Sequence, residues 1–209
     1  MKSLWRNSVQ HAGLALAAAL WITLSACSGI PESHYYSLTT ADTSEASATA
    51  AEFQAVLGVE RLDPGLMYFD DRIVYRADGN EVRYWNYHKW IAPPHILMTE
   101  AVRSHLKAAS LFRDVVNYPG EITADWKISG RILTFEEHNT PQGREAVVAL
   151  EVRLVEPVSR KMLWTKTYRR VKPATGNGAP AIVRTFDAAV QEILAQLTAD
   201  IKSVMQGIK

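Results

Sequence analysis

A single cysteine, Cys27, closes the tetrapeptide Leu-Ser-Ala-Cys near the start of the chain. A short basic head and the apolar run of residues 12–24 precede it. A basic head, an apolar middle and small residues before a cut site are typical of a secretory signal peptide. A cysteine directly after the cut matches a bacterial lipobox, in which the thiol takes a diacylglycerol and the freed amine takes an acyl chain. We therefore predict a signal peptide over residues 1–26 and lipidation at Cys27.

Two other interpretations of this segment stay open, namely an ordinary signal peptide and a buried anchor helix. The apolar run of about 13 residues is shorter than the roughly 20 that a membrane-spanning helix needs. Ser28, and not Asp, follows the cysteine. By the sorting rule of enteric bacteria, this predicts a lipoprotein at the periplasmic face of the outer membrane, held there by its covalent lipid.

Charge and composition argue against nucleic-acid binding, disulfides and cysteine-based metal sites. The chain has 209 residues, and removal of the signal peptide would leave all 22 acidic residues and 21 of the 23 basic ones, so the formal charge would be −1. A chain without excess positive charge is not expected to bind nucleic acid. Acylation of the one cysteine would leave none for a disulfide or a cysteine-based metal site.

The predicted mature chain divides into a tether and a folded domain. Residues 39–52 are almost entirely Thr, Ser, Ala, Asp and Glu. Such a segment buries too little apolar surface to order itself. We therefore predict a flexible tether over residues 27–52 and one folded domain over residues 53–209. If the β-prone residues 35–38 dock on the domain, the free tether is shorter.

The pattern of the folded part predicts an α+β domain. Residues 122–132, 148–154 and 161–171 alternate apolar and polar side chains, which favours an antiparallel meander with one apolar face. Residues 93–109 and 180–206 carry apolar side chains at spacings of three and four, which predicts amphipathic helices. We therefore expect an antiparallel sheet covered on one face by two helices.

The sequence carries no recognisable set of catalytic, cofactor-binding or metal-binding residues. His95 and His105 are ten residues apart and do not share a helix face as two ligands would. No Gly-x-Ser-x-Gly esterase elbow or phosphate-binding loop occurs. The adjacent carboxylates Glu136 and Glu137 are interpreted as the solvated edge of a loop over residues 138–143.

The densest aromatic segment offers a candidate partner-binding surface. Its candidate residues are Tyr84, Trp85, Tyr87 and Trp90. Tyrosine and tryptophan beside a basic residue favour protein interfaces. The alternative is that strand alternation buries every second one of them in the core. The sequence does not decide between the two.

Together, these features resemble a known family. The lipobox, residues 35–38, residues 70–76, residues 81–84 and Trp90 before an amphipathic helix are similar to the ABC-type transport auxiliary lipoproteins, in particular the PqiC (YmbA) group. The resemblance implies an MCE-domain protein as partner. It also implies a role as accessory subunit of an MCE-type ABC system that moves phospholipid or other apolar molecules between the inner and outer membranes.

Two other function classes stay in view beside this one. One is a structural or assembly lipoprotein of an outer-membrane machine, and the other is a lipid-handling enzyme, which the missing nucleophile set disfavours. The heptad-like stripe of residues 180–206 also allows a homo-oligomer, although packing on its own sheet is the favoured explanation of the stripe, and self-assembly through other faces stays open.

Overall fold

Ser33 begins the unit of the chain that contains the sheet and its helices. The computed structural model describes residues 31–40, 50–77 and 80–208. The predicted signal peptide and the lipidation site at Cys27 lie outside these residues.

One sheet and two helices make up the described part of the chain. The strands are β1 (His34–Tyr36), β2 (Phe53–Glu60), β3 (Arg72–Arg76), β4 (Val82–Trp90), β5 (Phe112–Tyr118), β6 (Trp126–Thr140), β7 (Gly143–Val155) and β8 (Met162–Pro173). The helices are α2 (Pro94–Ala108) and α3 (Gly178–Ile208). The fold is a single α+β domain, as the sequence predicts.

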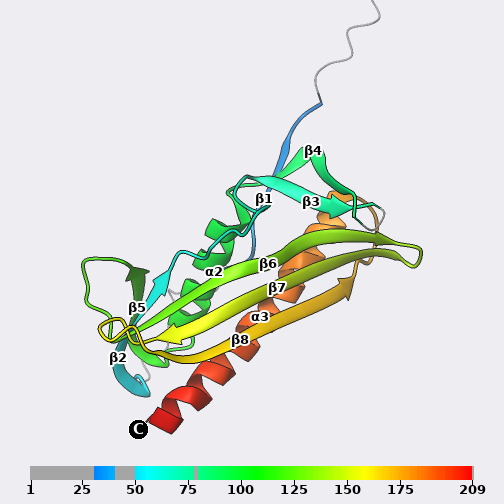
Figure 1. Ribbon diagram of the computed structural model, residues 1–209. Helices are drawn as coiled ribbons and strands as arrows, with labels where there is room; N and C mark the ends of the chain where they lie inside the picture. The colour runs from blue at the N-terminus through cyan, green and yellow to red at the C-terminus, as the bar shows by residue number, and fades with distance from the viewer. Residues whose placement is uncertain (1–30, 41–49, 78–79, 209) are drawn as a thin grey trace, which may run out of the picture. The chain divides into compact units, whose positions relative to one another are not determined.

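The long strand β6 organises the sheet (Figure 1). One of its edges pairs with β7 along nearly the whole strand, and β7 pairs with β8. Its other edge is shared by two shorter groups: residues 126–128 pair with β2, which pairs with β5, and residues 136–138 pair with β3, which pairs with β4 and then β1. Between the two groups, Asp63 bridges to Arg131.

The predicted antiparallel meander is wrong for half of this sheet. β6–β7, β7–β8 and the β3–β4 hairpin are antiparallel, but β2–β5, β2–β6, β3–β6 and β1–β4 are parallel, so the sheet is mixed. Parallel neighbours need a long crossover connection. Here β3, β4 and α2 separate β2 from its parallel neighbour β5. Alternation along a strand does not reveal such a distant partner.

A bulge in β6 keeps the apolar side chains on the helix face. The β6–β7 register shifts between Ile132 and Thr134. Before the shift Ile128 and Ile132 face the helices, and after it Phe135 does, opposite Val148. An extra residue in one strand reverses its alternation locally. The bulge therefore decides that Glu137 faces the helix side and Glu136 the other side.

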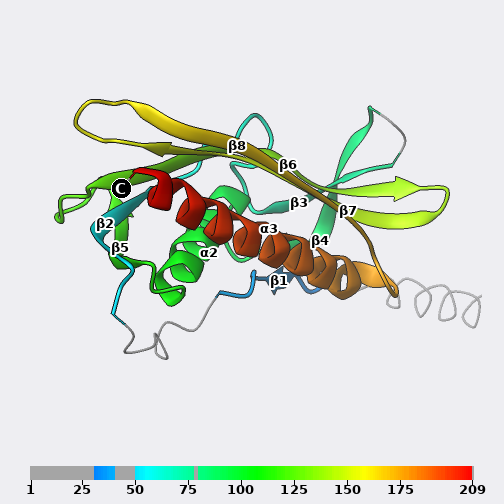
Figure 2. The same cartoon turned by 90° about the horizontal axis from the view of Figure 1, so that it is seen from below.

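Both helices cover the same face of the sheet (Figure 2). The apolar stripe of α3 is buried from end to end, at Ile182, Phe186, Val190, Ile193, Leu197 and Ile201. Burying one such side chain contributes about 1.5–3 kcal/mol, so the stripe is a main source of stability. Neither α2 nor α3 combines the length and hydropathy that crossing a bilayer requires.

The folded unit includes residues that precede the predicted domain boundary at Phe53. β1 adds to the sheet beside β4, and Tyr36 accepts a backbone hydrogen bond from the amide of Ile91 at 2.7 Å. Leu38 is buried, and the amide of Thr39 donates to Asp187 of α3 at 2.8 Å. Residues 35–38 thus dock on the domain, which is the condition under which the sequence predicted a shorter free tether.

Candidate functional site

A pocket of about 580 Å³ opens beside the aromatic strand β4. Tyr84, Trp85 and Tyr87, three of the four residues predicted to bind a partner, line it. The other lining residues come from β3, β4, β6 and β7: Tyr75, Asn86, His88, Glu137, Asn139 and Arg144. The structure therefore brings the exposed part of the aromatic segment together with charged residues from the β6–β7 hairpin.

Trp90, the fourth predicted residue, lies in the core. Its ring contacts Phe135 of β6 and Phe186 of α3, with centroids 5.3 and 5.6 Å away. Its side chain is fully buried and cannot meet a partner at the surface. Tyr87, in contrast, is 42% exposed. The core interpretation is thus correct for Trp90, and the partner-binding interpretation stays a prediction for Tyr84, Trp85 and Tyr87.

Trp85 is held in place by polar and aromatic contacts. Its indole Nε1 donates a 2.9 Å hydrogen bond to Oε2 of Glu137. The rings of Tyr75 and His88 meet it edge-on, with centroids 6.2 and 5.2 Å away. The Arg144 guanidinium lies 5.4 Å from its ring centroid. Fixed aromatic walls lose little conformational freedom on binding, which favours recognition of a ligand.

Arg144 contributes a guanidinium cation to the pocket. Its Nε donates to Oε1 of Glu137 at 2.5 Å, and its Nη1 donates to the carbonyl oxygen of Gly178, at the first turn of α3, at 3.0 Å. Its Nη2 is the one buried side-chain nitrogen or oxygen, among those of the described residues, without a hydrogen-bond partner. An acceptor that reached this nitrogen would gain a charge-assisted hydrogen bond.

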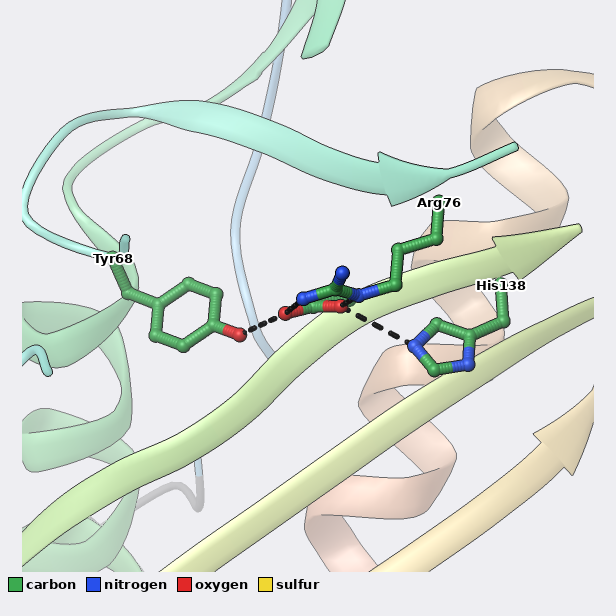
Figure 3. A network of polar contacts seen from close by, with 4 residues as sticks. Tyr68, Arg76 and His138 are labelled. Atoms are coloured by element: carbon green, nitrogen blue, oxygen red, sulfur yellow. Dashed lines mark hydrogen bonds and ion pairs between the residues drawn. The ribbon is translucent and has the colours of Figure 1, made fainter. Parts of the chain in front are cut away.

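Glu136 forms a second polar network on the opposite face of β6, shown in Figure 3. Tyr68 donates its hydroxyl proton to Oε1 at 2.5 Å, and Nη2 of Arg76 donates to the same oxygen at 3.1 Å. Nε of Arg76 donates to Oε2, and Nε2 of His138 lies 3.3 Å from that oxygen. The side chains of Tyr68, Arg76 and His138 therefore meet at one carboxylate.

Hydrogen bonds decide the charge state of Glu136. Burial alone would raise its pKa, but the bonds from Arg76 and Tyr68 outweigh burial and hold the pKa below its ordinary value. Burial and the same carboxylate raise the pKa of Tyr68. At neutral pH the network thus contains a carboxylate anion and a neutral phenol. Both oxygens of the Glu136 carboxylate already accept hydrogen bonds, which indicates a structural role.

The interpretation of Glu136 and Glu137 as a solvated loop edge is wrong. β6 continues to Thr140 and β7 starts at Gly143, so both carboxylates lie within a strand and are buried. Asn and Gly residues suggested a long loop, whereas the chain makes a tight reversal. The sequence did offer one indication that both carboxylates could be buried. Arg76 and Arg144 each lie near a predicted strand end, where each can neutralise one carboxylate.

No group of three or more His, Cys, Asp or Glu side chains in residues 31–40, 50–77 and 80–208 is arranged to hold a metal ion. In the pocket, the carboxylate of Glu137 is already bonded to Arg144 and Trp85. What remains for a ligand is aromatic surface with one cationic donor.

A known protein family matches most of this chain. The model of the ABC-type transport auxiliary lipoprotein component family matches residues 36–201. The chain belongs to this family. The match runs from β1 into α3, so it includes the pocket and both buried carboxylates. Among curated proteins, none matches the sequence.

Two crystal structures share the fold of this auxiliary lipoprotein. One is a Xanthomonas campestris protein of the DUF330 family, with a TM-score of 0.72 and 16% identity, covering 83% of this chain and 98% of the other. The second, an uncharacterized protein, has a TM-score of 0.65 and 14% identity and covers 82% and 99%. At these identities, the likeness concerns the fold alone.

Proposed function

We propose that this auxiliary lipoprotein is a non-enzymatic accessory subunit of an MCE-type ABC transport system that moves phospholipid or other apolar molecules between the two membranes. The family match over residues 36–201 is the observation that carries the transport role. The resemblance of residues 70–76 and 81–84 to the PqiC group supports the MCE partner. In this proposal, Cys27 is acylated and holds the domain at the periplasmic face of the outer membrane.

The aromatic pocket is the proposed docking site for the MCE-domain protein. Tyr87 and Trp85 supply the type of side chain that dominates binding energy at interfaces. Arg144 supplies a guanidinium cation beside them. Hydrogen bonds to Glu137 fix Trp85 and Arg144 before the partner arrives. This preorganisation supports a protein-binding role more strongly than exposure alone would.

The proposal includes a homo-oligomer that forms through a surface other than the α3 stripe. The stripe of α3 is buried against its own sheet, so it is not available for self-assembly. The outer edge of β8 has no strand neighbour among the described residues. A second copy would therefore bind through β8 or another exposed surface, not through the stripe.

Affinity purification from membranes of the native host tests this function. The chain, solubilised in mild detergent, should co-purify with an MCE-domain protein identified by mass spectrometry. Co-purification with an outer-membrane assembly machine in place of an MCE protein would favour the alternative, a structural or assembly lipoprotein. A chain that carries Tyr87→Ala serves as the matched control, because this exposed residue lies in the proposed docking site.

A further inference from the structure

Exposed apolar side chains gather where β1 meets the end of β4. Tyr35 is 58% exposed, Ile91 is 66% exposed and Phe69 is 61% exposed. Tyr35 pairs with Lys89, and the amide of Ile91 extends the same ladder to Tyr36. Tyr35 and Ile91 are thus diagonal neighbours. We call the surface of Tyr35, Phe69, Lys89 and Ile91 the β1 patch.

Phe69 precedes the segment on the opposite edge of β4 from β1. The amide of Trp90 donates to the carbonyl oxygen of Asp71, two residues after Phe69, at 2.7 Å, while β1 pairs with the other edge of β4. Lys89 is partly exposed within the patch, with its ammonium 3.4 Å from the carboxylate of Asp71. An aromatic and aliphatic surface around a lysine has the composition of a surface that lies at a membrane interface.

The length of chain before β1 places the β1 patch close to the predicted anchor. The compact unit begins at Ser33, six residues after Cys27. A fully extended chain spans at most about 3.6 Å per residue, so the Cα atoms of Cys27 and Ser33 are separated by no more than about 22 Å. Tyr35 follows two residues later. With Cys27 in the bilayer surface, this end of the domain cannot move far from the lipid.

We propose that the β1 patch rests on the phospholipid bilayer that holds the acylated Cys27, and so fixes the orientation of the domain on the membrane. The inference rests on the lipidation within the proposed function. The acyl chains alone provide stable attachment. The patch adds orientation: with Tyr35, Phe69 and Ile91 against the headgroups, the β7–β8 turn at the far end of the sheet points into the periplasm.

A fluorescence-quenching experiment on the full lipidated chain tests this orientation. Since Cys27 would be acylated, Ile91→Cys adds the single free thiol, to which the fluorophore NBD is attached. Val158→Cys is the matched control, because Val158 is 92% exposed in the β7–β8 turn. Both proteins are reconstituted in vesicles of phosphatidylethanolamine and phosphatidylglycerol. Neither substitution removes a buried side chain, so both proteins should fold.

The proposal predicts that only the label at residue 91 enters the lipid. Groups on a membrane-resting surface lie about 5–10 Å into the headgroup boundary, so lipids with a nitroxide quencher at that depth should reduce the emission of this label by about half. The label at residue 158 should keep its emission in water. If Cys27 is acylated, equal quenching at both positions, or none at either, would contradict the oriented contact. The proposed lipidation would still stand.

Two further results separate the inference from its basis. Mass spectrometry that shows Cys27 without acyl chains would overturn the proposed lipidation and the membrane contact with it. An unquenched label at residue 91 in vesicles that hold acylated protein would leave the lipidation standing. That second result would overturn the membrane contact of the β1 patch.

Discussion

Glu136 and Glu137 are consecutive residues of β6, yet different arginines bind their carboxylates on opposite faces of the sheet. Arg76 and Tyr68 hold Glu136, whereas Arg144 and Trp85 hold Glu137. One carboxylate thus fastens the β3 group of strands to β6, and the other supports a wall of the aromatic pocket. A strand with adjacent buried carboxylates needs an arginine on each face, since an unpaired buried charge is very unfavourable.

Glu136→Gln should destabilise the domain by about 3 kcal/mol, because it removes the buried carboxylate that pairs with the partly buried Arg76 cation. Urea unfolding followed by circular dichroism measures this loss. Glu121→Gln, the same change at an exposed position, should alter stability by less than about 0.5 kcal/mol. Equal midpoints for the two variants would contradict the structural role of Glu136.

Acid should weaken the folded state through the same residue. The folded-state pKa of Glu136 lies below its unfolded value, so its ion pair contributes stability that is fully present above the unfolded pKa of about 4.3 and is lost as the pH falls through the folded pKa. Stability measured from pH 6 down to pH 3 should therefore fall less steeply in Glu136→Gln than in the unsubstituted chain. Parallel pH curves would assign the acid sensitivity to other carboxylates.

Tyr87→Ala should weaken partner binding without loss of stability. A side chain that is 42% exposed contributes little to folding, but loss of an interface hot spot of about 1.4 kcal/mol or more lowers affinity at least tenfold. Pull-down of the MCE-domain partner, with thermal unfolding measured in parallel, separates the two effects. Val158→Ala, a truncation at the far end of the sheet, is the control. Undiminished binding by folded Tyr87→Ala would remove the pocket as the docking site.

Trp90→Ala should cost about 3–5 kcal/mol of stability, the usual range for a fully buried tryptophan. The truncation would leave a cavity against Phe135 and Phe186. Tyr35→Ala is the comparison, because it removes an exposed aromatic ring of the neighbouring strand. Chemical unfolding of both variants should give a large shift for residue 90 and a small one for residue 35. Similar small shifts would be inconsistent with a core position.

The sequence predicted elements that local periodicity defines. The stripe of α3, from Ile182 to Ile201, repeats every three or four residues, and burial of the stripe confirms the predicted helix. The helix predicted over residues 93–109 from the same type of spacing is confirmed as α2. Each of these features depends on residues close together in the chain, where the physical cause is visible in the sequence.

Partners distant in the sequence were not predictable in the same way. The parallel pairing of β2 with β5 joins Leu57 to Val115, and no feature of either strand selects the other. The bulge after Ile132 reverses the alternation, so the side chains beyond it were assigned to the wrong environment. Glu137 and Arg144 escaped notice as site residues because residues 138–143 were predicted to be a loop, whereas β6 continues to Thr140 and β7 starts at Gly143.

Mass spectrometry of the N-terminal peptide, from protein purified out of host membranes, tests the central claim of a lipid-anchored auxiliary subunit most directly. The account predicts a chain that starts at Cys27, with a diacylglycerol on the sulfur and an acyl group on the amine. A membrane fraction that retains the chain, and a soluble fraction that gains it in Cys27→Ala, would accompany this result. A mature N-terminus that carries no fatty acid would contradict the account.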